Sequence, residues 1–320
     1  MVQRKIPEAK PEFIERMKAL LNNDFKAYSK ILKQEPPRSI RCNTLKISVL
    51  KLKKRLETKG WKISQPWKEY PEVMIIENPL EPGELGRSLE HLLGYYYIQE
   101  LASMLPILAL KPKPNELILD LCSAPGSKTT QAATSMGNTG TIIANEISLG
   151  RIKILASNLE RCGVSNIIIT KKEGSALCKR LKKAGFQFDK ILVDAPCSGE
   201  GTLRSSFKTY AMWNIKTVKA LPRIQKQLLE SVLEILKPNG TIVYSTCTHA
   251  PEENEEVINY ILKKYKNQIQ IELISLPITC RPGIQSWESS KYDDQIKKTC
   301  RVYPQDNNTE GFFLAKLKKK

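Results

Sequence analysis

In two segments of the chain, a cysteine follows shortly after an apolar run. Residues 190–201 read KILVDAPCSGEG, so Asp194 follows the run directly and Cys197 lies in a Pro-Cys pair before a glycine-rich turn. Residues 241–247 read TIVYSTC and end in Cys247. Buried parallel strands are typically short apolar runs, and they carry their chemistry just beyond their carboxyl ends. If both segments are strands of one sheet, two thiols and a carboxylate meet there, although either segment alone also fits a strand and turn with an inert buried cysteine.

A loop of small residues, DLCSAPGSKT at 120–129, lies between a strand-like and a helix-like segment. Such a loop lets a ligand approach backbone N–H groups and the start of the helix. It is not a P-loop, because the first glycine position holds Cys122, and G-x-G-x-x-G is also absent. Glu146 lies 20 residues after Gly126, the spacing at which an acid binds ribose hydroxyls, and Glu173 follows the next strand. A nucleoside cofactor without a pyrophosphate fits, and S-adenosylmethionine is the obvious member of that class.

The elements that must position these residues alternate between strand and helix from residue 116 onward. This alternation predicts an α/β fold: a Rossmann-like domain with a mainly parallel sheet and helices on both faces. The expected strands are 117–121, 141–145, 167–170, 191–194, 241–245 and 269–274, with 312–317 closing the sheet. The expected helices are 127–136, 149–162, 175–183, 220–236 and 252–265. Residues 277–309 are polar and irregular, and the sequence assigns them no role.

Residues 1–94 predict a small α+β lobe, followed by a catalytic domain at 95–320. Within the lobe, apolar spacing predicts helices in 11–34 and 49–59 and strands at 39–47, 61–63 and 73–76. A helix within 94–110 is expected to open the second domain. Residues 1–62 hold 17 Lys and Arg against 6 Asp and Glu. This excess predicts a surface that contacts the phosphates of a nucleic acid.

Composition narrows the class of protein further. The 320 residues include 51 Lys and Arg against 33 Asp and Glu, a net charge of +18, which favours a polyanionic partner. No long apolar run predicts a membrane span, and the first residues lack the apolar core of a secretory signal, so a cytoplasmic protein is expected. Eight cysteines without a C-x-x-C pair, and only two histidines, argue against zinc and against a disulfide framework, so the cysteines are expected to be reduced.

On these motifs the chain resembles the NOL1/NOP2/Sun-type RNA cytosine-5 methyltransferases, most of all the compact archaeal tRNA enzymes. DLCSAPGSKT resembles the cofactor loop of the family, VDAPCSGEGTLR its substrate-acid motif and YSTCTHAPEENEEV its nucleophile motif. RCNTLKI, GYYYIQELASML and TEGFFLAKL are further similarities. Ser123 and Ser127 replace an Ala and a Gly of the family's loop, and Glu146 and Glu173 stand where Asp is common. These departures could loosen cofactor binding, but they remove no group that the chemistry needs.

The resemblance implies a covalent mechanism. A thiolate adds to C6 of cytosine and makes C5 nucleophilic, with help from an acid at N3. The Pro-Cys pair of DNA cytosine-5 enzymes would nominate Cys197 as nucleophile. The resemblance instead nominates Cys247, with Cys197 assisting product release, Asp194 on the N3/N4 edge and Lys128 supporting charge nearby. A helix start at 251–252 would favour a Cys247 thiolate, although Glu252 and Glu253 oppose it.

The cofactor set follows from the same resemblance. It comprises Cys122, Ser123, Ala124, Pro125, Gly126, Ser127, Lys128, Glu146, Arg151, Glu173 and Asp194. No metal is expected.

The expected partner is RNA, with tRNA favoured over rRNA, and a monomer is the working expectation. Three other functions are alternatives to RNA cytosine-5 methylation. A non-catalytic RNA-binding or assembly protein should have lost a catalytic group, and none is missing. A DNA methyltransferase would use the other cysteine as nucleophile. A zinc deaminase is excluded, because position 200 is Glu200 rather than a cysteine and no H-x-E motif precedes it.

Overall fold

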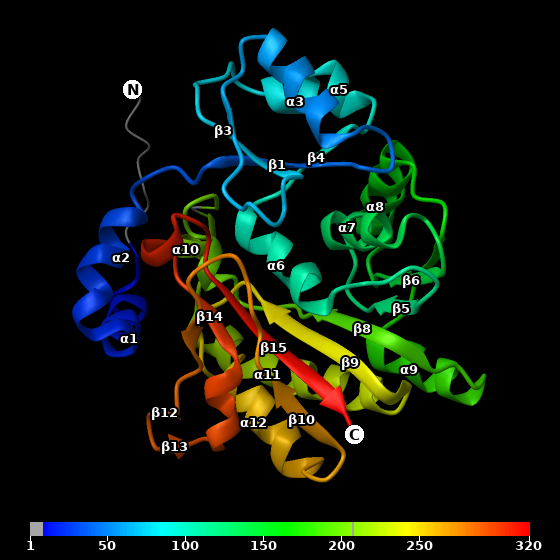
Figure 1. Cartoon of the computed structure of the whole chain (residues 1–320). Coiled ribbons are helices and arrows are strands. Elements are labelled where there is room, and N and C mark those ends of the chain that lie inside the picture. The colour runs from blue at the N-terminus through cyan, green and yellow to red at the C-terminus, as the bar shows by residue number, and fades with distance from the viewer. Residues whose placement is uncertain (1–8, 207) are drawn as a thin grey trace.

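The computed structural model describes residues 9–206 and 208–320. A small four-stranded sheet with its helices lies above a nine-stranded sheet that has helices on both faces (Figure 1). Among the described residues, no helix is long and apolar enough to cross a membrane.

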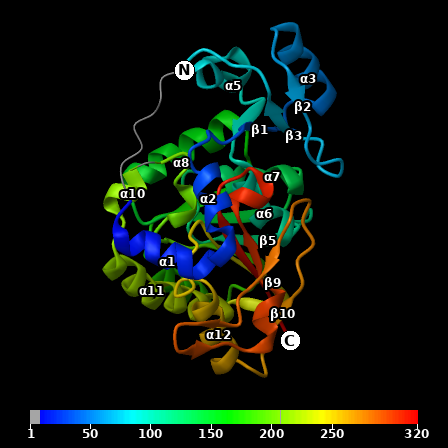
Figure 2. The ribbon, with the colours of Figure 1, turned by 90° about the vertical axis from the view of Figure 1, so that its left-hand side faces the viewer.

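The first two helices belong with the large sheet rather than with the small one. Helices α1 (Pro11–Leu21) and α2 (Phe25–Ile31), joined by the 3₁₀ turn η1 (Asn22–Asp24), lie across the side of the molecule near α11 (Ile215–Leu233) (Figure 2). Their buried side chains Phe13 and Met17 share a hydrophobic cluster with Trp213 and Tyr303. The chain therefore first packs against the part of the molecule that contains the large sheet, and it forms the small sheet afterwards.

The small sheet has the antiparallel order β2-β3-β1-β4. Its strands are β1 (Arg38–Cys42), β2 (Ile63–Ser64), β3 (Val73–Ile76) and β4 (Tyr96–Ile98). Helix α3 (Val49–Thr58) packs on it through Leu52 and Leu56, and the short helices α4 (Glu84–Arg87) and α5 (Leu89–Leu92) precede β4.

Two predictions for this region are wrong. The strand expected at 39–47 ends at Cys42, because Asn43 starts a turn in which its side chain accepts a hydrogen bond from Leu45 N (3.3 Å). The helix expected within 94–110 begins only at Leu101, since residues 96–98 form β4 and pair with β1.

The large sheet has the order β11-β14-β15-β9-β8-β5-β6-β7, and β10 also pairs with β15. The parallel strands are β5 (Leu117–Asp120), β6 (Thr141–Asn145), β7 (Ile167–Thr170), β8 (Phe188–Asp194) and β9 (Leu236–Thr246). From β5 the chain builds outward through β6 and β7, then returns to place β8 on the other side of β5. This reversal is a switch point of the kind at which α/β sheets bind their ligands.

Strand β15 (Phe312–Lys319) does not close the sheet, contrary to prediction. It pairs antiparallel with β9 on one side, and with β14 (Cys300–Val302) and β10 (Ile269–Glu272) on the other. Of the strands beyond β15, β10 was predicted, whereas β11 (Arg281–Pro282) and β14 are too short to show a period in the sequence.

Helices cover both faces of the large sheet, as predicted. One face carries α6 (Leu101–Leu110), α7 (Ser127–Met136) and α8 (Leu149–Cys162), and the other carries α9 (Gly174–Lys183), α11 and α12 (Glu255–Lys264). The predicted bounds of α7, β6, α8 and β7 are confirmed. Helix α11 starts earlier than expected, because Asn214 caps it at Thr217 N (2.8 Å).

The polar segment 277–309 extends the sheet. It contains β11 (Arg281–Pro282), β12 (Ser286–Trp287), β13 (Ser290–Lys291), η3 (Asp294–Lys298), β14 and α13 (Pro304–Asn307). A disulfide joins Cys280 and Cys300, so the expectation that every cysteine is reduced is wrong for this pair. Sequence spacing could not reveal the pair, because it is the antiparallel pairing of β11 with β14 that brings Cys280 to Cys300.

The small sheet is fastened tightly to the helices below it. Asn43 Nδ2 donates to the carbonyls of Gly94 (2.8 Å) and Cys162 (2.7 Å). Gly94 has φ +70°, and a Cβ added there would lie 1.8 Å from the carbonyl oxygen of Arg161. The buried guanidinium of Arg41 donates to Ser127 O (3.0 Å) at the start of α7. The RCNTLKI segment thus supplies the junction between the two parts.

Candidate active site

The two strand-end cysteines are neighbours. Cys247 directly follows β9, Cys197 lies three residues after β8, and their Sγ atoms are 3.2 Å apart. The hydrogen bond to Cys247 and burial raise the pKa of Cys197 well above its ordinary value. The raised pKa keeps Cys197 protonated at neutral pH, so its thiol can donate a hydrogen bond to the sulfur of Cys247.

The acid after β8 is held by two partners. Asp194 Oδ2 lies 2.8 Å from Lys128 Nζ, and its Oδ1 accepts a hydrogen bond from Ser245 Oγ (2.7 Å). Burial acts to lower the pKa of Lys128, but the charge of Asp194 outweighs it and the pKa is raised. Lys128 also lies over the ring of Phe312, 5.4 Å from its centroid. The ammonium therefore stays charged beside a fixed carboxylate, whose oxygens each keep a lone pair for a substrate.

A cavity of about 430 Å³ opens over these groups. Cys247, Asp194 and Lys128 line it, whereas Cys197 is not among the lining residues. The opposite wall consists of the segment 36–39 and of Ile98, and Glu100, Ser103, Ser205 and Glu310 supply further polar groups. Of the two candidate nucleophiles, Cys247 is thus the one that a ligand in this cavity meets.

A polar network fixes the turn that carries Cys197. Glu253 Oε2 accepts hydrogen bonds from Ser198 N (3.0 Å) and from Gln225 Nε2 (2.9 Å). Gln225 also donates to the carbonyl of Pro196 (2.9 Å). Burial raises the pKa of Glu253 to about 7. This network was not predicted from the sequence, because it joins three segments that are far apart along the chain: a loop, α11 and the segment before α12.

The helix start expected at 251–252 is placed one turn later. Helix α12 begins at Glu255, because the side chain of the preceding residue, Asn254, makes hydrogen bonds to the segment 246–248. Its Oδ1 accepts from Thr246 Oγ1 (2.6 Å), and its Nδ2 donates to Thr248 O (2.9 Å). The argument that a helix N-terminus beginning at 251–252 activates Cys247 is therefore wrong.

The predicted cofactor loop joins β5 to α7 beside the switch point. Gly126 adopts φ +103°, and a Cβ there would lie 3.0 Å from the side chain of Leu155, so the turn suits only glycine. Ser123 Oγ donates to Asn145 O (2.9 Å), which turns its hydroxyl into the fold. Asp120 Oδ2 accepts a hydrogen bond from Thr129 Oγ1 (2.7 Å), while its Oδ1 is buried and has no hydrogen-bond partner among the residues that the structure describes. Burial raises the pKa of Asp120 to about 7.

Glu146 and Arg151 form the adjoining part of the predicted site. Glu146 is buried after β6, accepts from Ser148 N (2.9 Å) and lies 2.9 Å from Arg151 Nη1. Arg151 Nη2 donates to the carbonyl of Ala124 (2.6 Å) in the cofactor loop. The structure therefore brings the loop and the expected ribose acid together.

Glu173 has a visible structural task. It caps α9 by accepting hydrogen bonds from Ser175 N (3.0 Å) and Ala176 N (2.8 Å). Burial opposes its ionisation, but these hydrogen bonds outweigh it and lower the pKa of Glu173. Its role in cofactor binding stays a prediction.

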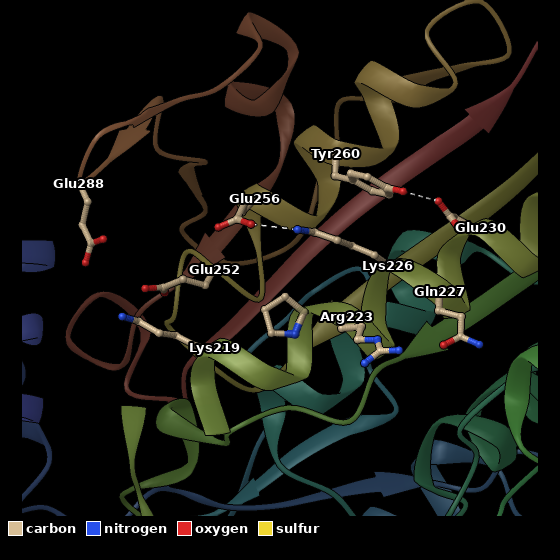
Figure 3. A pocket seen from close by; sticks show the side chains of 10 residues that line it. Lys219, Arg223, Lys226, Gln227, Glu230, Glu252, Glu256, Tyr260 and Glu288 are labelled. Atoms are coloured by element: carbon tan, nitrogen blue, oxygen red, sulfur yellow. Dashed lines mark hydrogen bonds and ion pairs between the residues drawn. The ribbon is translucent and has the colours of Figure 1, made fainter. Parts of the chain in front are cut away.

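A second, larger cavity of about 670 Å³ lies between α11 and α12. Figure 3 shows its charged lining, in which Lys226 pairs with Glu256 (2.9 Å) and Tyr260 donates to Glu230 (2.7 Å). Its lining has three basic and four acidic side chains, and the described residues that line it include no cysteine. The two strand-end cysteines and Asp194 lie at the other cavity.

Several lining residues escaped the sequence analysis. Ser103, Glu310 and Phe312 lie inside motifs quoted for the resemblance, so their position was a usable signal. The Pro36-Pro37 pair reads only as a helix stop.

Solved structures agree with the fold. A methyltransferase homologue from Pyrococcus horikoshii is 34% identical and superposes with a TM-score of 0.84 over 97% of this chain and 95% of that one. NSun6 from Pyrococcus horikoshii with SFG is 26% identical, with a TM-score of 0.82 over 97% and 98% of the two chains. The fold is that of S-adenosylmethionine-dependent methyltransferases.

The family follows from sequence profiles. Residues 107–318 match the profile described as 16S rRNA methyltransferase RsmB/F, and residues 10–101 match the N-terminal domain of 16S rRNA methyltransferase RsmF. The chain belongs to the RsmB/F family, and the resemblance drawn from its motifs is confirmed.

Curated relatives bear two different substrate names. A tRNA (cytosine(49)-C(5))-methyltransferase of Pyrococcus abyssi is 42% identical over 281 residues, which cover 88% of each chain. Ribosomal RNA small subunit methyltransferase F of Aliivibrio salmonicida is 40% identical over 88% of this chain. The matched region spans only 58% of that bacterial relative.

Proposed function

We propose that this chain transfers a methyl group from S-adenosylmethionine to C5 of a cytosine in tRNA, through a covalent adduct between Cys247 and C6 of the base. The observation that carries the proposal is the cavity in which Cys247, Asp194 and Lys128 meet, with the sulfur of Cys197 3.2 Å from the sulfur of Cys247. A cytoplasmic, monomeric enzyme is part of the same proposal.

The residues around the cofactor loop fit S-adenosylmethionine. The glycine turn at Gly126 brings backbone close to a ligand, and Asp120 and Glu146 supply buried carboxylates beside it. The free Oδ1 of Asp120 is a buried acceptor in need of a donor, such as an ammonium or a hydroxyl. SFG, bound to a related structure, is an analogue of this cofactor. When bound, S-adenosylmethionine supplies an electrophilic methyl group on a sulfonium.

The chain's own residues prepare the base. The thiolate of Cys247 adds to C6, forming the S–C6 bond, and the electron pair of the C5–C6 double bond moves into the ring toward N3. Asp194, fixed by Lys128 and Ser245, lies ready to hydrogen-bond the N3/N4 edge that receives this charge. C5 then has the enamine character that a methyl acceptor needs.

Product release reverses the addition. A base takes the C5 proton, a role that solvent water can fill in the open cavity. The C–H electron pair restores the C5–C6 double bond, and the S–C6 electron pair leaves on the sulfur of Cys247, where a proton donor stabilises the departing thiolate. The Cys197 thiol is that donor, because its raised pKa keeps it protonated and its sulfur is 3.2 Å away.

tRNA is preferred to rRNA because of the lengths of the relatives. The relative named as a tRNA enzyme is covered over 88% of its length, whereas the one named as an rRNA enzyme is covered over 58%. In either RNA the target must be unpaired or flipped, because the thiol and the methyl donor need access to both faces of the ring.

The test is transfer of tritium from labelled S-adenosylmethionine into unmodified tRNA and 16S rRNA transcripts. We expect counts in tRNA that are lost in Cys247→Ala, and a covalent RNA adduct that accumulates in Cys197→Ala. Cys178→Ala, which removes a buried thiol of α9 outside the cavity, serves as the control and should keep full activity.

The other outcomes are equally informative. Counts in rRNA alone would overturn the substrate, and counts that survive Cys247→Ala would overturn the nucleophile. Cofactor binding without transfer to any RNA would favour a non-catalytic RNA-binding protein.

A further inference from the structure

A buried carboxyl group of the cavity wall has no task in the chemistry above. Glu310 lies two residues before β15 and is only 3% exposed. Its Oε1 accepts a hydrogen bond from Ser205 N (2.7 Å), and its own N–H donates to Glu100 Oε1 (2.9 Å). Its Oε2 is buried and has no hydrogen-bond partner in the part of the chain that the structure describes.

The free oxygen of Glu310 belongs to a side chain that lines the cavity of Cys247 and Asp194. Leaving a buried acceptor unsatisfied destabilises the folded state, so folding alone gives no reason to retain it. Burial raises the pKa of Glu310 to about 7, and the neighbouring Glu100 adds to this effect. A hydrogen-bond donor of a molecule in the cavity would remove the penalty.

Glu100 shows the contrast. It lines the same cavity, but both of its oxygens are occupied, by Ser103 N (3.0 Å) and by Glu310 N. Both oxygens of Glu100 thus have a structural role, one of them as the cap of α6. Only one oxygen of Glu310, Oε1, has such a role in the described part of the chain. The asymmetry between two adjacent buried carboxyl groups indicates that Glu310 is turned toward a ligand.

A cytidine that meets Cys247 at C6 and Asp194 at N3/N4 has two kinds of donor left. One is the remaining N–H of the exocyclic amine, and the other is the 2′-hydroxyl of the ribose. The first distinguishes cytosine from uracil, and the second distinguishes RNA from DNA. Both would offer a polar hydrogen to a carboxyl oxygen.

We propose that Glu310 is a specificity-determining residue that accepts a hydrogen bond from the target nucleotide through its free Oε2. This inference rests on the proposed function, since it takes the cavity to hold the target cytidine. Glu310→Gln tests it sharply: the amide keeps an oxygen for Ser205 N and places an N–H₂ donor where the free acceptor was.

The experiment compares three versions of the RNA that accepts methyl groups in the tritium assay. They carry at the target position cytidine, 2′-deoxycytidine, or the riboside of 2-pyrimidinone, which lacks the exocyclic amine. Adduct formation under single-turnover conditions gives kcat/KM for each version. We expect Glu310→Gln to lower this value about 10- to 100-fold on cytidine RNA, and to leave it unchanged on the version that lacks the bonded donor.

The two modified RNAs identify the donor. Equal rates for wild type and variant on 2′-deoxycytidine assign it to the ribose, and equal rates on the pyrimidinone assign it to the amine. The same loss on all three RNAs, or no loss on any, overturns the proposal. If wild type reacts with no RNA, it is the proposed function that has failed.

Glu253→Gln is the matched control. Glu253 is also buried, also has one oxygen without a partner and also has its pKa raised to about 7, yet it is not among the cavity-lining residues. Its substitution should change all three rates by one common factor. If Glu310→Gln does not fold, Glu310→Asp, which withdraws the carboxylate by one methylene, is used in the same comparison with the same expected pattern.

Discussion

The hydrogen bond between the two thiols makes them chemically unequal. Cys197 holds the proton, because the bond to Cys247 and burial both raise its pKa. Cys247 lines the cavity and has Lys128 as a cationic neighbour there. Nucleophilicity and access therefore coincide at Cys247.

This inequality predicts selective alkylation. At pH 7, iodoacetamide should modify Cys247 well before Cys197, because the thiolate is the reactive form. Peptide mapping by mass spectrometry measures the order. Equal labelling of both cysteines, or faster labelling of Cys197, would contradict the assignment. In Lys128→Met, loss of the neighbouring charge should slow the labelling of Cys247.

Glu253 predicts a pH dependence of stability. Its pKa is raised by burial from an ordinary value near 4.5 to about 7, so the folded state favours the protonated form. The stability that this group contributes is fully present below pH 4.5 and is lost as the pH rises through 7. Glu253→Gln removes the dependence, so its unfolding free energy relative to wild type should rise by on the order of 3 kcal/mol between pH 4.5 and pH 8.

Denaturant unfolding at both pH values, followed by far-UV circular dichroism, measures this change. Glu57→Gln on α3, an exposed carboxylate, is the control and should show no comparable shift. A constant difference between Glu253→Gln and wild type at the two pH values would refute the prediction.

At the scale of elements, the disulfide ties the edge strands β11 and β14 together. It closes a loop with a sequence separation of 20 residues, which corresponds to about 3 kcal/mol in the chain-entropy account. Reduction should therefore lower the midpoint of thermal unfolding of wild type. The double variant Cys280→Ser/Cys300→Ser should unfold at that lower temperature and be insensitive to reductant. Identical midpoints with and without reductant would show that the bond contributes nothing.

The parallel half of the sheet was predictable because buried strands have a simple signature. Each is a continuous apolar run followed by small or acidic residues, and the helices between them have a regular period, so the bounds of α7, β6, α8 and β7 agree. Strand β4 was not predicted, because only its pairing with β1, more than 50 residues away, distinguishes it from the apolar helix that follows. Strands β11 and β14 exist only as pairs in the sheet.

The candidate site divides in the same way. That the two strand-end thiols and Asp194 would lie together followed from the requirement that both strands belong to one sheet, and the structure places them so. The contribution of the 36–39 segment to the cavity was not predictable, because it depends on how a distant loop folds over the sheet edge. Position along the chain contains no information about that approach.

At the scale of the whole molecule, the positive charge gathers where it can bind phosphates. Helix α3 lies at the end of the molecule opposite α12 (Figure 1), and its exposed Lys51 and Lys54 have no ion pair among the described residues. Binding of RNA to such cations releases counterions, so affinity falls with salt. Lys51→Gln/Lys54→Gln should reduce the slope of log K against log salt by about 2.

Filter binding or fluorescence anisotropy across a salt series gives this slope. Lys263→Gln/Lys266→Gln on and after α12 removes the same charge from the opposite end and should leave the slope nearly unchanged. If both pairs of variants change it equally, the charge acts through the whole field of the molecule rather than through contacts at α3.

The contact at Gly94 also limits which RNAs can react. Backbone meets backbone there without space for a Cβ, and Asn43 bonds both sides, so the small sheet cannot tilt on the helices below it without breaking these bonds. The span from Lys51 to Cys247 is therefore a constant length of the fold. An RNA that contacts both α3 and the cavity has to match that length by its own bending and unstacking. A cytosine in a stiff stem, or at another distance from the phosphates that contact α3, would therefore not react, whatever nucleotides lie beside it. An RNA that contacts both places would therefore be accepted or rejected by how well its shape fits this fixed distance.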